Sequence, residues 1–569
     1  MYLIAFATDY DGTLAHDGRV ADETLAALER LKASGRRLLM VTGRELPDLK
    51  RTFDRLDLFD AVVAENGALL YFPASQEQQL VGAEPPPALV AALAARGVAP
   101  LSVGRGILAT WRPHETAALE AIRDLGLEWK IVFNKGAVML LPPGVNKASG
   151  LAAALQALGL SPLNVLAIGD AENDHALLQA SGCAVAVANA LDAVKATADV
   201  VTARDHGGGV TETIDRLLED ECFYIDRAAE RRRVALGAEP DLVIRPQHGS
   251  VLIAGSSGIG KSTLATMAIE KLAAEGFQVC VLDPEGDYDH LQNAIVLGDA
   301  KRPPLESEVL DVLEKPAAAA LVVNMLGLKL EDRPGFFAAL LSAVRDLRAR
   351  TARPHWLLID EAHHMLPARS ETAEAGVPAA LSSAIYITVH PEEMRPSALS
   401  SVETVIGVGP KAADVIAAFC GATGIALPPL PAADGDDTVL FWNRASDRPP
   451  RWVEVDRPVQ EHRRHTRKYA EGSIPARDSF YFRGPDGRLN LRAHNLSLFV
   501  QMAEGVDDAT WLYHLGRGDY SRWFRDIIKD DALAGEAEAI ETERDALASR
   551  QAVRAMIERR YTAPAKAAP

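Results

Sequence analysis

The stretch that decides the fold of the first half of this chain is LIAFATDYDGTL, residues 3–14. Its apolar beginning predicts a buried strand, and Asp9 and Asp11 follow that strand directly. Open α/β sheets build their sites at the carboxyl ends of the strands. Two carboxylates at this spacing suit a nucleophile with a neighbouring general acid/base. Asp-Gly is also a common turn dipeptide, so the segment alone leaves a structural turn open.

The strand pattern continues to about residue 220, where short apolar segments alternate with Ala/Leu-rich helical segments. This alternation is typical of a parallel sheet covered on both faces. The segments after the first strand are RLLMVT (37–42), AVVAEN (61–66), NVLAIG (164–169) and AVAVAN (184–189).

Three polar fragments follow later strands or open a helix. Thr42 ends the second strand, where its hydroxyl group can bind a phosphate oxygen. Lys147 opens a helical segment and can neutralise the charge of a phosphoryl group. Asp170 and Asp174 lie in GDAEND after a later strand, and such carboxylates suit a hard cation such as Mg²⁺.

In this order the four fragments resemble the motifs of the haloacid-dehalogenase (HAD) phosphohydrolase superfamily: DxDGT, a Thr or Ser, a Lys, and GDxxND. The resemblance covers residues 1–222 and implies a Rossmann-like core. It implies Asp9 as the nucleophile, Asp11 as the general acid/base, and Thr42 and Lys147 as phosphate ligands. The Mg²⁺ ligands that it implies are Asp9, the Asp11 carbonyl, Asp170 and Asp174, and the substrate contacts are Gly43, Arg44 and Asn173.

The spacing of the motifs also resembles one subclass, the Cof-like subclass IIB. Thr42 follows Asp9 by 33 residues, too few for a large inserted domain, whereas Thr42 and Lys147 are separated by excess chain. The resemblance therefore implies a small C2-type α+β cap over about residues 83–143 and a small phosphometabolite, such as a sugar phosphate, as substrate. The candidate cap contacts are Trp111, Arg112, Asn134 and Lys135.

A second motif begins after the strand SVLIA at residues 250–254. GSSGIGKST (255–263) meets the GxxxxGK[ST] pattern and runs into an amphipathic helix. Backbone N–H groups of such a loop surround the phosphates of ATP. Lys261 is expected to reach the β/γ-phosphates and Ser262 the Mg²⁺ ion. The expected ATP-binding residues are Gly255, Ser257, Gly258, Gly260, Lys261, Ser262, Thr263 and Asp360.

The strand HWLLI at 355–359 ends in Asp360 and Glu361. Asp360 is expected to orient the water ligands of the metal ion, and Glu361 to polarise the attacking water. With DPEGDY at 283–288, this half resembles the HerA/FtsK-like P-loop ATPases. The resemblance implies ring-shaped homo-oligomers and DNA translocation, although Thr388-Val389-His390 departs from the Ser/Thr-Gln common in those motors.

Charge and composition restrict the partners. The 569 residues include 78 acidic and 60 basic ones, a net charge of −18. We therefore do not expect a basic face over the whole molecule, whereas a local basic patch stays open, and nucleic acid is not favoured as a partner. No apolar run approaches the ~18 residues of a membrane span, and no signal-peptide pattern opens the chain. We therefore expect a cytoplasmic protein with no membrane partner.

The remaining segments divide the chain into four predicted parts. These are the phosphatase domain at 1–222, a charged linker at 223–245, the ATPase domain at 246–457, and a mostly helical C-terminal domain at 458–569. The charged run 230–233 predicts a solvated face. Between residues 459 and 495, eight Lys/Arg oppose four acidic residues, and aromatic residues interleave with them. Those aromatics predict either a small helical core or a surface for an anion, a nucleic acid strand or another subunit.

The leading hypothesis is an α/β multidomain, bifunctional chain: a Mg²⁺-dependent phosphatase acting through an aspartyl-phosphate, coupled to an ATP-hydrolysing P-loop module. The alternative is an oligomeric, ATP-driven nucleic-acid motor or defence factor with an accessory phosphatase for nucleotides or strand ends. Stimulation of ATP hydrolysis by DNA distinguishes the two hypotheses.

Overall fold

The structure is a computed structural model with two compact units, Met1–Ser256 with Met267–Asp456, and Ser257–Thr266 with Arg457–Pro569. The ranges that it describes are 2–134, 136–246, 249–256, 259–289, 291–315, 320–329, 331–353, 355–368, 381, 383–432, 438–446, 448–459, 478–528 and 530–561.

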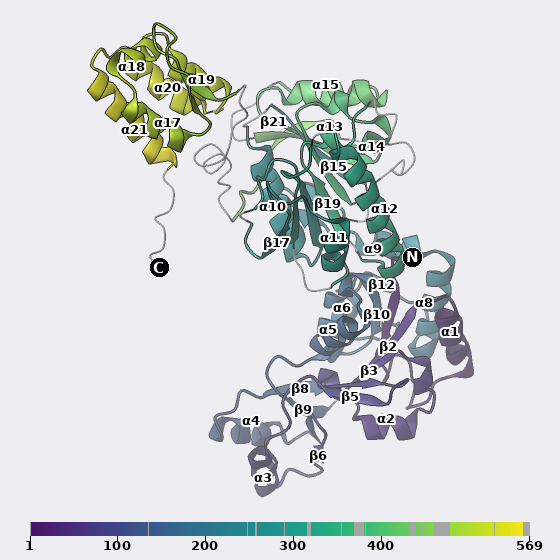
Figure 1. The fold of residues 1–569 in the computed structure, drawn as a ribbon. Coiled ribbons are helices and arrows are strands. Elements are labelled where there is room, and N and C mark those ends of the chain that lie inside the picture. The colour runs from purple at the N-terminus through teal and green to yellow at the C-terminus, as the bar shows by residue number, and fades with distance from the viewer. Residues whose placement is uncertain are drawn as a thin grey trace. The chain divides into compact units, whose positions relative to one another are not determined.

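An eight-stranded sheet organises the N-terminal part of the described chain, in the order β12-β11-β10-β1-β2-β3-β4-β5. Neighbours from β12 to β3 are parallel, whereas β4 and β5 are antiparallel. Helices α1 and α8 cover one face and α5 and α6 the other (Figure 1), so the central strands are buried. The strands are β1 (Ala5–Thr8), β2 (Arg37–Val41), β3 (Ala61–Ala64), β4 (Leu69–Phe72), β5 (Glu77–Leu80), β10 (Val165–Gly169), β11 (Cys183–Ala186) and β12 (Val200–Val201). The helices are α1 (Asp22–Ala33), α2 (Leu46–Thr52), α5 (Lys147–Leu158), α6 (His175–Ala180), α7 (Asp192–Lys195), α8 (His206–Glu219) and α9 (Glu221–Ala228).

A small α+β cap is inserted between β5 and α5. Its antiparallel sheet has the order β6-β7-β9-β8, and two helices close an apolar core that includes Leu89, Leu108 and Ile122. The α+β cap of the predicted fold class is thereby confirmed. Its elements are α3 (Pro87–Ala95), β6 (Ser102–Val103), β7 (Leu108–Trp111), α4 (Glu115–Asp124), β8 (Lys130–Asn134) and β9 (Ala137–Leu141).

The short turn η2 (Glu65–Gly67) joins the core to both the cap and α5. The buried Glu65 carboxylate accepts hydrogen bonds from the backbone N–H groups of Gly106 at 2.6 Å and Arg105 at 3.2 Å in the cap. Gly67 has φ +108°, and a Cβ there would lie 2.0 Å from the carbonyl oxygen of Asn146. A glycine is therefore required where this turn meets the start of α5.

The charged run after α9 is solvated only in part: Glu230 and Arg233 are exposed, as expected, whereas Arg231 is half-buried and Arg232 is buried. Arg232 is 9% exposed and donates to the carbonyl groups of Gln179 and Ser181. Arg231 binds the Asp199 carboxylate at 2.6 Å. These guanidinium groups satisfy carbonyl oxygens at the end of α6, which a reading of charge alone does not reveal. A two-stranded hairpin follows, β13 (Val234–Ala235) with β14 (Val243–Ile244).

A second, nine-stranded sheet has the order β17-β18-β16-β19-β20-β15-β21-β22-β23. Its neighbours are parallel from β17 to β21, and the last two strands are antiparallel. Strand β20 lies between β15 and β19. The strands are β15 (Ser250–Ala254), β16 (Gln278–Asp283), β17 (Ala294–Leu297), β18 (Ala320–Asn324), β19 (His355–Ile359), β20 (Ala384–Thr388), β21 (Val402–Val408), β22 (Thr438–Asn443) and β23 (Arg451–Glu454). The helices are α10 (Lys261–Ala274), α11 (Glu306–Leu313), α12 (Arg333–Thr351), α13 (Ala362–Met365), α14 (Pro396–Ser400) and α15 (Ala412–Thr423).

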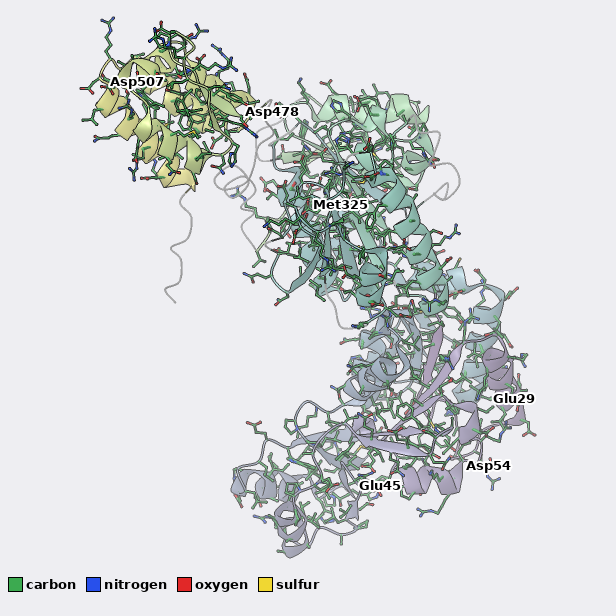
Figure 2. All side chains as sticks on the ribbon, viewed as in Figure 1. Glu29, Glu45, Asp54, Met325, Asp478 and Asp507 are labelled. Carbon is green, nitrogen blue, oxygen red and sulfur yellow. The ribbon has the colours of Figure 1, made fainter. Side chains whose placement is uncertain are left out.

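The C-terminal part is mostly helical, as predicted, with one hairpin. Asp507, labelled in Figure 2, caps α18 by accepting a hydrogen bond from the backbone N–H of Thr510. The elements are β24 (Phe480–Phe482), β25 (Leu491–Ala493), α17 (Leu496–Gly505), α18 (Asp508–Leu515), α19 (Asp519–Asp526), α20 (Asp531–Ile540) and α21 (Ala546–Tyr561). Among the described residues, none of the helices combines the length and apolar character needed to cross a bilayer.

We predict that Gly67→Ala lowers the free energy of unfolding by about 3 kcal/mol, because the new methyl group meets the Asn146 carbonyl and the backbone is held at positive φ. Gly35→Ala is the matched control: Gly35 has φ +87° but open space around a Cβ, so only the backbone term of about 1 kcal/mol remains. Denaturant unfolding monitored by circular dichroism measures both. Equal losses for the two variants would contradict the close approach at Gly67.

Candidate functional site

Lys147 lies at the centre of the first site. Its ammonium group donates to Asp9 Oδ1 at 2.6 Å and to Asp174 Oδ1 at 2.5 Å, and the side chain is 1% exposed. Asn146 caps α5 through a hydrogen bond from the backbone N–H of Ser149 at 2.8 Å, which fixes the first helical residue, Lys147. The sequence motifs are thus brought together from β1, α5 and the end of β10.

The carboxylates of Asp9, Asp170 and Asp174 each offer an oxygen within 4.8 Å of the others. Thr13 donates to Asp170 Oδ1 at 2.9 Å, and Asp174 Oδ2 accepts from the backbone N–H of Asp170 at 3.0 Å. Three carboxylates and one ammonium group leave a formal charge of −2, which matches a divalent cation, and oxygen ligands are those that Mg²⁺ prefers. These residues therefore fit the ion. The sequence analysis missed the role of Thr13, although Thr13 belongs to the DxDGT motif.

The buried charges change two pKa values. Burial raises the pKa of Asp9 to about 8, Asp174 adds to the rise, and Lys147 offsets it only in part. Burial by itself lowers the pKa of Lys147, but Asp174 and Asp9 outweigh burial and hold that pKa above its usual value. Lys147 therefore stays an ammonium ion, while Asp9 holds a proton in the absence of further positive charge.

Asp11 is held by Arg44. Arg44 Nε donates to Asp11 Oδ2 and Nη2 to Asp11 Oδ1, both at 2.7 Å, and Nη1 donates to Asp48 at 2.8 Å. The hydrogen bonds to Asp11 raise the pKa of Arg44 above its usual value. Such a two-point contact fixes the direction of a carboxylate, and the sequence did not reveal this pairing.

A cleft of about 540 Å³ lies between core and cap and contains Asp9, Asp11, Gly43 and Arg44. Its cap wall includes Trp111, which is 55% exposed, and Asn134. Glu45, labelled in Figure 2, accepts a hydrogen bond from Ser102 of the cap. Arg112 packs over Phe133 instead of lining this cleft, and Lys135 is outside the described residues.

Two further predicted phosphatase residues, Thr42 and Asn173, are held by hydrogen bonds. Thr42 is buried, and its Oγ1 accepts a hydrogen bond from the backbone N–H of Arg44 at 3.1 Å. Asn173 donates to Asn66 Oδ1 at 3.0 Å. Asn66 has φ +54° in the η2 turn, so this turn also orients the loop after β10.

In the second site, the loop after β15 leads into α10. Lys261 and Ser262 are buried, Gly260 has φ +98°, and Thr263 is half-buried. Ser262 Oγ is buried and has no hydrogen-bond partner among the described residues, which fits a hydroxyl ligand of Mg²⁺. Gly255 lies at the end of β15, and Ser257 and Gly258 are outside the described residues.

Asp360 and Glu361 follow the buried strand β19. The Asp360 carboxylate accepts a hydrogen bond from the backbone N–H of Glu361 at 2.9 Å, and Glu361 has φ +44°. His363 Nδ1 lies 3.0 Å from Thr388 Oγ1 at the end of β20 and 3.5 Å from Glu361 Oε2. The expected water-polarising carboxylate is therefore linked to the neighbouring strand through His363, a contact that the sequence did not predict.

The segment 283–288 forms a turn closed on Asp283. This buried carboxylate accepts hydrogen bonds from four successive backbone N–H groups, including Gly286 at 2.7 Å and Tyr288 at 2.9 Å. Burial raises the pKa of Asp283 to about 6, although these hydrogen bonds oppose the rise.

The two halves of the chain match two different protein families. Residues 6–92 and 117–214 match the model of the haloacid dehalogenase-like hydrolases, and residues 247–376 match that of the central domain of helicase HerA.

Individual relatives match the first half. A phosphoglycolate phosphatase from Methanothermobacter thermautotrophicus is 35% identical over 224 residues, which are 38% of this chain and 98% of that protein. A phosphoglycolate phosphatase from Methanopyrus kandleri is 32% identical over 37% of this chain and 96% of its own length. A solved haloacid dehalogenase-like hydrolase from Bacteroides thetaiotaomicron aligns with a TM-score of 0.33 and 20% identity, over 37% of this chain and 98% of its own.

We predict that Mg²⁺ binding at the first site weakens as the pH falls below about 8, because the ion must displace the proton that burial keeps on Asp9. One displaced proton corresponds to about tenfold in affinity for each pH unit. Isothermal titration calorimetry between pH 6 and 8.5, in buffers of different ionisation enthalpy, measures affinity and proton release together. Asp9→Asn should abolish the proton release. A Mg²⁺ affinity of the wild-type site that is constant over this range would contradict the prediction.

Proposed function

This chain belongs to the haloacid dehalogenase-like hydrolases and is a phosphoric monoester hydrolase, and we propose that it cleaves a small phosphorylated carboxylate through an aspartyl-phosphate on Asp9. The observation that carries the proposal is the buried group of Asp9, Asp170, Asp174 and Lys147, of which Asp9 lines the cleft. Mg²⁺ bound by Asp9, Asp170 and Asp174 would neutralise charge on the phosphoryl oxygens.

In the proposed reaction, a carboxylate oxygen of Asp9 attacks phosphorus and the bond to the leaving oxygen breaks. Asp11 gives its proton to that oxygen and later takes one from the water that hydrolyses the aspartyl-phosphate. Lys147 and Thr42 bind the phosphoryl oxygens. Two nitrogens of Arg44 donate hydrogen bonds to Asp11 at 2.7 Å. Asp11 must therefore give up one of these hydrogen bonds when it contacts the leaving oxygen.

The cleft supports a small substrate with a second negative charge. Arg51 lines it, its side chain is 74% exposed, and it contacts Asp48 at 3.1 Å; a guanidinium group recognises a carboxylate through two parallel hydrogen bonds. The relatives from Methanothermobacter and Methanopyrus are phosphoglycolate phosphatases. Phosphoglycolate carries a carboxylate group in addition to its phosphate group. We therefore place phosphoglycolate ahead of the sugar phosphates that the sequence suggested.

We predict that Asp9→Asn lowers kcat/KM for phosphoglycolate by about 10³-fold or more, because the amide cannot form the aspartyl-phosphate. Asp17→Asn is the matched control, since the Asp17 side chain is 93% exposed. Phosphate release with Mg²⁺ from phosphoglycolate, glucose 6-phosphate, glycerol 3-phosphate and AMP measures activity and preference. Equal rates for wild type and Asp9→Asn would overturn the proposed site, and preference for glucose 6-phosphate would overturn the substrate class alone.

The second half is proposed to hydrolyse ATP with Lys261, Ser262, Asp360 and Glu361, and to influence the phosphatase. Contacts within the first unit support this coupling. Asn164 Nδ2 donates to the Ala352 carbonyl at 2.6 Å, and Arg353 Nη2 donates to the Gly159 carbonyl at 2.7 Å.

These contacts join the starts of two strands that lead to the two acidic sites. Strand β10 begins directly after Asn164 and runs to Asp170, whereas β19 begins soon after Arg353 and runs to Asp360. A shift of β19 that accompanies nucleotide binding can thus be transmitted to β10 through packed backbone.

We predict that ATP changes the phosphatase rate of the wild type at least about twofold, a coupling of roughly 0.4 kcal/mol or more. Asn164→Ala should remove this response while leaving both activities measurable, because its side chain touches neither site. Lys261→Ala should remove the response through loss of ATP binding. An unchanged ATP response in Asn164→Ala would contradict transmission through this contact.

A further inference from the structure

An open hollow of about 870 Å³ lies on the C-terminal domain, within the size range of ~300–1,000 Å³ that ligand sites occupy. The hairpin β24–β25 and the helices α18 and α19 supply its lining. No part of the proposed phosphatase or ATPase chemistry uses these elements.

The floor of the hollow is held by His514, which is 5% exposed. Its Nε2 accepts a hydrogen bond from the backbone N–H of Arg483 at 3.0 Å. The ring proton is therefore on Nδ1, which lies 2.9 Å from Asp519 Oδ2 and donates to it. This pair fixes the hairpin against the α18–α19 turn, so the side chains around the hollow start from a rigid backbone.

Most aromatic residues of this domain do form its core, as one of the two sequence-based alternatives predicted. Phe480, Phe482, Trp511 and Tyr520 are buried. Tyr513 and Tyr481 are different: both are half-buried and line the hollow, and Tyr513 lies under the guanidinium group of Arg517 at 5.2 Å from its ring centroid.

Positive charge gathers around this ring. Arg483, Arg517 and Arg522 line the hollow and are exposed. The Asp519 carboxylate lies 2.9 Å from His514 Nδ1. It is farther from the guanidinium groups of Arg517, at 3.5 Å, and Arg522, at 3.4 Å. With Asp526, the lining has three arginines against two aspartates, a local excess of positive charge in a chain of net charge −18.

We propose that this hollow binds a nucleotide, with its phosphate groups on the arginines and its base on the ring of Tyr513. Guanidinium groups bind phosphate oxygens through two parallel hydrogen bonds, and aromatic rings stack on bases of any sequence. The nucleotide can be free or part of a single strand, and the experiment distinguishes these two sources.

The probe is fluorescein-labelled oligo-dT, titrated with the full-length chain in EDTA and without ATP, and followed by fluorescence anisotropy. The double variant Arg517→Ala/Arg522→Ala should bind at least about tenfold more weakly. The slope of log affinity against log salt concentration should be smaller in magnitude by about 1.4, because two phosphate contacts are lost and each contributes ~0.7 to the slope for a single strand. Arg525→Ala is the matched control. Arg525 lies on α19, as Arg522 does, but it pairs with Glu538 at 2.7 Å and does not line the hollow.

Tyr513 provides an independent variant. Tyr513→Phe keeps the ring and should bind like the wild type, whereas Tyr513→Ala should bind more weakly. AMP, which lacks the β- and γ-phosphates that a P-loop holds, reports the free-nucleotide source: tight AMP binding that depends on Arg517, without oligo-dT binding, identifies a free nucleotide as the ligand. If neither probe binds, or if both bind the double variant and the Arg525→Ala control equally well, the proposal is overturned.

Discussion

The buried ammonium group of Lys147 is the interaction on which the first site depends. Asp9 is distant in sequence from Asp170 and Asp174, and the three carboxylates would repel one another if brought together alone in a buried place. Lys147 pairs with two of them at 2.5 and 2.6 Å, and α5 holds it there because Gly67 lets the Asn146 backbone approach the η2 turn. The negative charge that remains, formally −2, matches the charge of a divalent cation.

The cap and the core are tied by the same turn. Glu65, at the beginning of η2, binds two backbone N–H groups of the cap, while Asn66 binds Asn173 beside the carboxylates. One three-residue segment therefore contacts the cap, the Lys147 helix and the acidic loop. The positions of the cap and of the residues around the carboxylates therefore both depend on this segment.

Much of this architecture could be predicted from the sequence. The polar motifs at the strand ends indicated the site residues, and the alternation of apolar strand segments with helical segments indicated a parallel sheet. Asp9, Lys147, Asp170 and Asp174 lie together as their motifs indicated. The pairing of Arg44 with Asp11 and the burial of Arg232 could not be predicted, since each depends on a partner far along the chain. The Glu361–His363–Thr388 contact likewise depends on the placement of β20 beside β19, which sequence spacing does not specify.

The proposed mechanism requires that Asp9 becomes covalently phosphorylated during turnover. The most direct measurement is mass spectrometry of peptides from enzyme quenched in acid within milliseconds of mixing with phosphoglycolate and Mg²⁺. If Asp9 is the nucleophile, a phosphoryl adduct on Asp9 forms and decays at rates compatible with phosphate release. Steady phosphate release without any adduct on Asp9 would contradict this mechanism, and would indicate that water attacks the substrate directly.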